Sequence, residues 1–125
     1  MVGTINCARE AEVDGAVAAA RAAFESGWST TPAAQRAALI HKFADLLEAA
    51  SEEVTKAEVQ AMGQPASIMS GFILPITAQT FRYYAGWADK IEGQTFPAEG
   101  GRWTCTQYEP IGVCAGIGPW NATIG

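Results

Sequence analysis

The chain has 125 residues and a mass of 13.2 kDa, which is enough for one domain of ordinary size and leaves no room for a second. Hydrophobic residues make up 49% of the sequence and charged residues 17%, a composition that provides a core and excludes a disordered chain. Thirteen acidic residues against eight basic ones give a net charge of −5 at pH 7, which argues against a nucleic-acid partner.

The first two predicted elements are helices. Residues 9–26 carry apolar side chains every three or four positions and many alanines, and Gly27 follows them, so they predict one helix. A second helix is expected to start with Thr31 as its cap and Pro32 in its first turn. Its apolar stripe reaches Leu47 and lies opposite an ordinary solvated face.

A third helix is predicted from a cap at Ser51 to Met62, where the turn at 63–65 ends it. The fourth helical region is interrupted by Pro75, which predicts a kink or a restart there. An amphipathic stripe rich in aromatic residues then spans 76–91. Such a stripe could stack on bases or on a cofactor, but packing on neighbouring helices is the interpretation we adopt for an acidic chain.

The remaining segments read as loop and strand. Residues 94–101 hold two glycines and a proline and predict a loop, whereas the alternation in 102–108 predicts a half-exposed strand. Residues 111–117 are apolar or glycine throughout, which is typical of a strand inside a parallel sheet. Exposing its branched side chains would forfeit roughly 1.5–3 kcal/mol each, and no other segment could pair beside it. The fold class we predict is α/β: N-terminal helices plus the first strand of a Rossmann-like parallel sheet, incomplete as given.

The residues after this apolar segment are placed where a ligand site is expected. In open α/β sheets ligands bind beyond the carboxyl ends of the strands. Gly116 and Gly118 allow the backbone to approach a ligand closely, although Asn121 replaces the last glycine of a dinucleotide fingerprint. The glycines alone are therefore a weak nucleotide signal.

Three blocks of the sequence resemble the NAD(P)-dependent aldehyde dehydrogenase superfamily. They are residues 13–24 (VDGAVAAARAAF), 81–91 (FRYYAGWADKI) and 109–121 (EPIGVCAGIGPWN), and they occur in the family's order. The resemblance covers essentially the whole chain. It implies that residues 1–125 are the N-terminal part of the cofactor-binding domain, with about 102–109 as a strand of the bridging and oligomerisation sheet. It also implies assembly as a homodimer or homotetramer.

The resemblance implies oxidation of an aldehyde to a carboxylic acid with NAD or NADP. In the family a cysteine thiolate adds to the carbonyl as a thiohemiacetal, and a glutamate-activated water releases the acid. Asn121 resembles the asparagine whose side-chain amide stabilises the oxyanion. Ile117, Gly118, Pro119, Trp120 and Asn121 together resemble the segment that lines the cofactor beside its nicotinamide half. The cysteine nucleophile and the glutamate base are expected outside these 125 residues, so the chain alone should be inactive.

The other reactive side chains suggest no second site. Cys114 is expected in a buried strand, Cys105 on the preceding strand and His41 beside a helix stripe, all in structural or solvated roles. An odd cysteine count without metal spacing, no secretory signal and no membrane-length apolar run predict a cytoplasmic protein with no membrane partner and no metal. The alternative function is a non-catalytic helical interaction module that binds a partner through 111–117 by β-augmentation.

Overall fold

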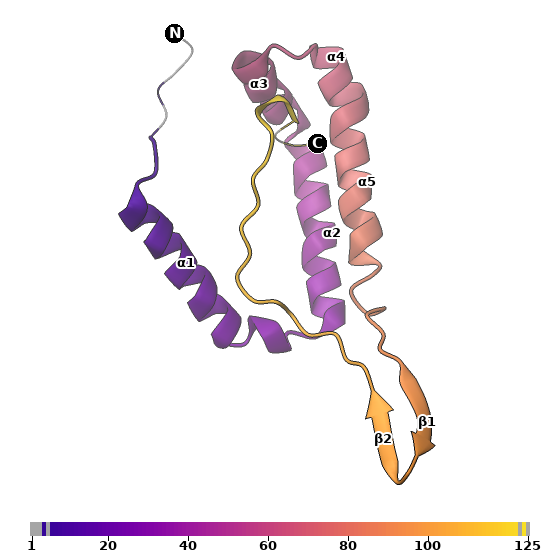
Figure 1. The fold of residues 1–125 in the computed structure, drawn as a ribbon. Coiled ribbons are helices and arrows are strands. Elements are labelled where there is room, and N and C mark those ends of the chain that lie inside the picture. The colour runs from indigo at the N-terminus through magenta and orange to yellow at the C-terminus, as the bar shows by residue number, and fades with distance from the viewer. Residues whose placement is uncertain (1–3, 5, 123, 125) are drawn as a thin grey trace.

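The computed structural model describes residues 4, 6–122 and 124, and its elements form a helical body with a projecting hairpin (Figure 1). In chain order the described elements are α1 (Glu10–Glu25), the 3₁₀ turn η1 (Trp28–Thr30), α2 (Ala33–Ala49), α3 (Ser51–Met62), α4 (Ala66–Ile68), the π-helical η2 (Met69–Ile73), α5 (Leu74–Ala85), β1 (Thr95–Glu99), β2 (Arg102–Cys105) and the 3₁₀ turn η3 (Trp120–Ala122). The first three long helices confirm the predicted ones to within about two residues at each end.

The core of the described residues lies where α2 and α5 run side by side. The fully buried positions are mostly small, as a close approach of two helices requires. They are Ala44, Met69, Leu74, Ala78 and Ala85. Phe43 and Phe81 extend this contact edge to face, with their ring centroids 4.7 Å apart.

Helix α1 stands apart from the α2–α5 pair (Figure 1) and buries none of its residues. Val13 and Val17 of its apolar stripe are about half exposed. The start of the helix is secured locally, because the Arg9 backbone N–H donates to Glu12 Oε2 at 2.8 Å. Gly27 ends the segment with a φ of 127°, a conformation that favours glycine.

Two predicted caps are wrong by one residue. Pro32, and not Thr31, is the N-cap of α2, since the Thr31 hydroxyl donates back to the Gly27 carbonyl at 3.2 Å. Ser51 is the first residue of α3 and Ala50 precedes it as the cap. The predicted stop after α3 is confirmed, because Gly63 adopts the left-handed conformation with a φ of 79°.

The interruption predicted at Pro75 is not observed as a break, because α4, η2 and α5 follow one another without a gap. Pro75 lies in the first turn of α5, and the π-helical η2 directly before it makes this helical region irregular. The helix predicted through residue 91 is wrong at its end, because α5 stops at Ala85. The Gly86 N–H donates to the Arg82 and Tyr83 carbonyls there, and residues 86–89 form a turn.

The segment predicted as a loop, 94–101, instead contributes a strand. β1 pairs antiparallel with β2, with Thr95 opposite Cys105 and Phe96 opposite Thr104. The chain reverses at Gly100 and Gly101, whose φ angles of 58° and 75° suit the tight turn that joins two twisted strands. The second strand is accordingly shorter than the predicted 102–108.

The strand predicted at 111–117 does not form. These residues have no regular structure, and Ile111 and Ile117 are 95% and 99% exposed. A strand requires a neighbour to satisfy its backbone groups, and no described segment is paired with this one. Cys114, predicted to be buried there, is exposed as a result. Among the described residues, no helix combines the length and apolar character needed to cross a membrane.

Candidate functional site

The predicted site residues, 117–121, lie in the exposed C-terminal segment that runs from the hairpin back past α2 (Figure 1). Ile117 is 99% exposed and Trp120 is 68% exposed. Asn121 is also exposed and belongs to η3. The structure thus brings an apolar side chain, an indole and a neutral amide together along one short segment, all accessible from solvent.

The two glycines of this segment face open space. A Cβ built on Gly116 or on Gly118 would meet no heavy atom within 4 Å, and neither residue has a positive φ. Neither packing nor backbone strain within the described residues therefore requires glycine here. The absence of side chains leaves the backbone open to close approach by a ligand or another segment.

One hydrogen bond connects the end of this segment to the helical body. The Thr77 hydroxyl on α5 donates to the Ile124 carbonyl at 3.1 Å, and Thr77 is only 9% exposed. Ile124 itself is half-buried. The short helical turn that contains Asn121 is therefore attached just beyond its end to the buried part of α5.

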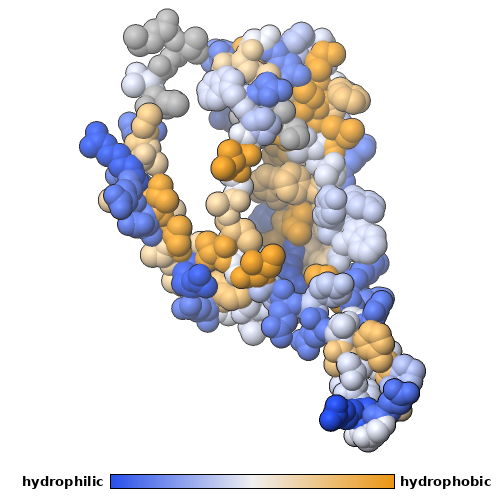
Figure 2. All heavy atoms as spheres, in the orientation of Figure 1, coloured by the Kyte–Doolittle hydropathy of each residue, from blue (hydrophilic) through white to orange (hydrophobic). Residues whose placement is uncertain are grey.

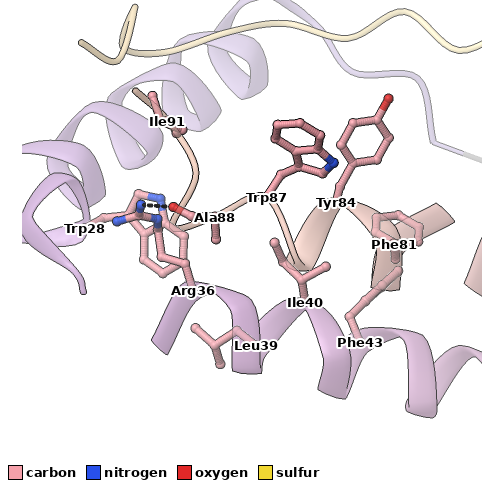
Figure 3. A pocket seen from close by; sticks show the side chains of 10 residues that line it. All are labelled: Trp28, Arg36, Leu39, Ile40, Phe43, Phe81, Tyr84, Trp87, Ala88 and Ile91. Carbon is pink, nitrogen blue, oxygen red and sulfur yellow. Dashed lines mark hydrogen bonds between the residues drawn. The ribbon is translucent and has the colours of Figure 1, made fainter. Parts of the chain in front are cut away.

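A groove of about 450 Å³ lies between α2, α5 and η1 (Figure 3). Apart from Arg36 and the Tyr84 hydroxyl its lining is apolar: Trp28, Arg36, Leu39, Ile40, Phe43, Phe81, Tyr84, Trp87, Ala88 and Ile91. Tyr84, Trp87 and Ile91 are between 49% and 68% exposed. The prediction that the aromatic stripe is packed core is therefore wrong for the described residues, where its side chains line an open surface.

Arg36 closes one end of this groove. Its guanidinium donates to the Thr31 carbonyl and, at 3.4 Å, to the Ala88 carbonyl, drawn as a dashed line in Figure 3. The side chain thereby joins the linker before α2 to the turn after α5. Sequence reasoning missed this groove, although its lining residues Leu39, Ile40 and Phe43 belong to the predicted apolar stripe of the second helix.

A second cavity of about 990 Å³ lies at the base of the hairpin. It is lined in part by Trp28, Trp103, Cys105, Tyr108 and Glu109. Residues 117–121 line neither this cavity nor the groove in Figure 3. The structure thus places the predicted site on an exposed surface segment.

The reactive side chains are scattered across the described part of the chain. Cys7, Cys105 and Cys114 are free and exposed, and the Cys114 thiol donates to the Gly112 carbonyl at 3.6 Å. His41 is exposed, which agrees with the prediction of a solvated side chain and not with that of a packed one. In residues 4, 6–122 and 124 no cluster of ligands suited to a metal ion is found.

The charged groups near the core form a network between α2 and α5. Arg82 contacts Asp45 at 2.7 Å and Glu48 at 2.6 Å. The hydrogen bond from Arg82 holds the pKa of the Glu48 carboxyl below its ordinary value, and both carboxylates raise the pKa of Arg82. Lys90 lowers the pKa of Asp89 in the same way. Arg82 is half-buried, whereas the carboxylates and Lys90 are exposed.

Helix α1 has one apolar side and one hydrophilic side. Figure 2 shows apolar residues along the side of α1 that faces the rest of the molecule and hydrophilic residues along its outer side. The exposed valines Val13 and Val17 belong to this helix. Together with the exposed isoleucines of 111–117, they form apolar surface that the described residues leave uncovered.

The described residues form a helical unit, a hairpin and then a glycine-rich apolar segment. Comparisons with known proteins identify the family to which this chain belongs. The profile of the aldehyde dehydrogenase family matches residues 1–125. Benzaldehyde dehydrogenase, mitochondrial, of Antirrhinum majus is 45% identical over 111 residues, 88% of this chain and 21% of that protein. Cytosolic aldehyde dehydrogenase 1 of Rattus norvegicus is 42% identical over 119 residues, 92% of this chain and 23% of that protein.

Solved structures agree with the sequence relatives. The NAD+ complex of aldehyde dehydrogenase from Bacillus cereus has a TM-score of 0.79 and 43% identity, covering 83% of this chain and 21% of that one. The chain belongs to the aldehyde dehydrogenase family. It spans between a fifth and a quarter of the length of these relatives.

This membership confirms the predicted fold class, an α/β fold of which the described residues form mainly helices. It does not favour the alternative of a non-catalytic interaction module.

Proposed function

We propose that this chain contributes to an enzyme that oxidises an aldehyde to a carboxylic acid with NAD or NADP. The observation that carries the proposal is the family match over residues 1–125, which includes the exposed segment 117–121. Structural similarity to an NAD+ complex, at 43% identity, supports the choice of cofactor class. In this proposal residues 1–125 are the N-terminal part of the cofactor-binding domain, and about 102–109 form a strand of the bridging sheet.

The segment 117–121 has the chemistry needed to line a nicotinamide. Gly118 leaves open space over the backbone, and Ile117 and Trp120 offer exposed apolar surface beside it. Pro119 restricts the backbone between them. We assign Ile117, Gly118, Pro119, Trp120 and Asn121 to the cofactor-lining surface. A bound nicotinamide would supply the hydride acceptor for the oxidation.

Asn121 is assigned the oxyanion-stabilising role. Its side-chain amide is exposed and uncharged, so it donates hydrogen bonds to developing negative charge without transferring a proton. Losing one such donor typically costs about 3–4 kcal/mol of transition-state stabilisation. The cysteine nucleophile and the glutamate base are assigned to residues other than these 125. Cys105 and Cys114 have no described basic partner that would activate them.

Assembly and location complete the proposal. The family resemblance supports a homodimer or homotetramer, and the exposed apolar surfaces of α1 and 111–117 are compatible with burial in a larger assembly. A cytoplasmic location is supported by the three free cysteines, which suit a reducing compartment. The mitochondrial benzaldehyde dehydrogenase among the relatives supports a mitochondrial location as the alternative.

A chimeric enzyme tests the proposed activity. The stretch of Bacillus cereus aldehyde dehydrogenase that matches this chain would be replaced by residues 1–125, and aldehyde-dependent formation of NADH would be measured. We expect the chimera to be active and the isolated 125-residue chain to be inactive. The control is the same enzyme with its matched stretch deleted. A chimera that folds and binds NAD but does not oxidise aldehydes would contradict the proposal.

A further inference from the structure

The hydroxyl of Thr77 makes an unusual contact for a helical threonine. Thr77 lies within α5, next to buried Ala78, and its Oγ1 donates to the Ile124 carbonyl 47 residues further along the chain. Thr80, one turn later, donates to the Ile76 carbonyl of its own helix at 2.8 Å, as exposed helical threonines commonly do. The Thr77 hydroxyl therefore connects α5 to the C-terminal segment, whereas the Thr80 hydroxyl bonds within α5.

This contact joins the end of the segment to α5. The described residues 107–122 make no hydrogen bond that reaches the helices. The donor lies in the rigid part of the molecule, because Thr77 is 9% exposed and its neighbours Leu74 and Ala78 are almost completely buried. The acceptor lies in a segment whose preceding residues, 114–121, are exposed. A buried position of α5 thus contacts the end of an exposed segment.

The attachment limits where Asn121 can lie. Asn121 precedes Ile124 by three residues, and an extended chain spans at most about 3.6 Å per residue. The Cα atom of Asn121 therefore lies within about 11 Å of the Cα atom of Ile124, and the hydrogen bond holds the Ile124 carbonyl beside α5.

We propose that Thr77 is a positioning residue, whose hydrogen bond to the Ile124 carbonyl places the Asn121 amide for oxyanion stabilisation. This inference rests on the proposed function. Thr77 itself touches no reacting group in this assignment and acts only through the segment that it holds. A donor misplaced by about 1 Å loses much of its effect on rate, so the contact should influence turnover.

Hydrogen–deuterium exchange on the 125-residue chain tests the attachment without reference to activity. Thr77→Val removes the hydroxyl and keeps the side-chain shape, Thr77→Ser keeps the hydroxyl, and Thr80→Val is the matched control. We expect faster exchange across the helical turn at 120–122 in Thr77→Val by about tenfold, and rates like those of the unmodified chain in the other two. Unchanged exchange in Thr77→Val would overturn the attachment.

Kinetics of the same variants in the active chimera test the catalytic consequence. We expect Thr77→Val to lower kcat per active site about tenfold with KM for aldehyde changed less than about twofold, and Thr77→Ser to restore kcat. A merely structural role would reduce the amount of folded enzyme and leave kcat per active site unchanged. Faster exchange with unchanged kcat would overturn the positioning role. A silent Asn121→Ala variant would instead overturn the proposed function, with the exchange result still standing.

Discussion

Arg82 on α5 holds Glu48 on α2 through two parallel hydrogen bonds, Nη1 to Oε1 at 2.8 Å and Nη2 to Oε2 at 2.6 Å. This paired geometry is the strongest arrangement of a guanidinium and a carboxylate. It joins the same two helices that bury Ala44 and Ala78, so charge and packing act on one interface.

The first prediction concerns the pH dependence of this pair. Because Arg82 lowers the pKa of Glu48 in the folded chain, the pair stabilises the fold above the carboxyl's unfolded-state pKa, and this contribution is lost as the pH falls through the lowered value. Glu48→Gln should therefore lower the free energy of unfolding slightly at neutral pH and not in strong acid. Urea unfolding at both pH values measures this. Glu92→Gln, at an exposed position outside the helices and in no described ion pair, is the control. A Glu48→Gln loss that is equal at both pH values would contradict the account.

The second prediction compares two glycines. A Cβ on Gly93 would lie 1.9 Å from the Thr106 carbonyl oxygen at the base of the hairpin, whereas one on Gly15 of α1 would meet nothing within 4 Å. Gly93→Ala should lower the free energy of unfolding by about 1–3 kcal/mol and open the hairpin. Gly15→Ala should raise it by about 0.5–1 kcal/mol, because alanine favours helix. Denaturant unfolding measures the free energy of unfolding of both variants. Equal changes in the two variants would be inconsistent with the described backbone.

The third prediction concerns the buried hydroxyl of Thr55 on α3, which has no hydrogen-bond partner in the described residues. Removing an unsatisfied buried polar group is neutral or stabilising. Thr55→Val should therefore raise the free energy of unfolding by up to about 1 kcal/mol. Thr55→Ser keeps the hydroxyl and loses a methyl group, so it should lower stability by about 0.8 kcal/mol. A clear loss of stability in Thr55→Val would show that the hydroxyl has a partner.

The fourth prediction concerns self-association. Ile111 and Ile117 are almost completely exposed, and an uncovered apolar segment promotes association between chains. The double variant Ile111→Lys/Ile117→Lys should shift the isolated chain toward monomer in sedimentation experiments. Gln60→Lys/Gln79→Lys adds the same charge at exposed helical positions and is the control. Equal shifts in both variants would mean that charge, and not the apolar segment, controls association.

Local patterns predicted the helices well. Apolar periodicity and the stop at Gly63 depend on only a few neighbouring residues, and the structure confirms the helix end that Gly63 indicated. The hairpin was missed because the glycines at 100–101 suggested a loop. The alternating strand residues on either side of them were the signal for a two-residue turn.

Features that depend on distant residues were predicted poorly. The strand at 111–117 needs a neighbour, and the aromatic stripe ending at Ile91 needs a covering surface, which the described residues do not provide. The role of Asn121 came from a resemblance and not from periodicity. The contact between Thr77 and Ile124 could not be predicted, since a hydroxyl in a helix gives no indication of an acceptor 47 residues away.

The fifth prediction tests the assignment of Asn121 as the oxyanion donor, using steady-state turnover of the chimeric enzyme. Asn121→Ala should lower kcat by about 10²–10³-fold while the free energy of unfolding and NAD binding change little. Asn6→Ala makes the same substitution at an exposed position before α1 and should leave kcat unaltered. A chimera that keeps its full turnover with alanine at position 121 would contradict the central claim.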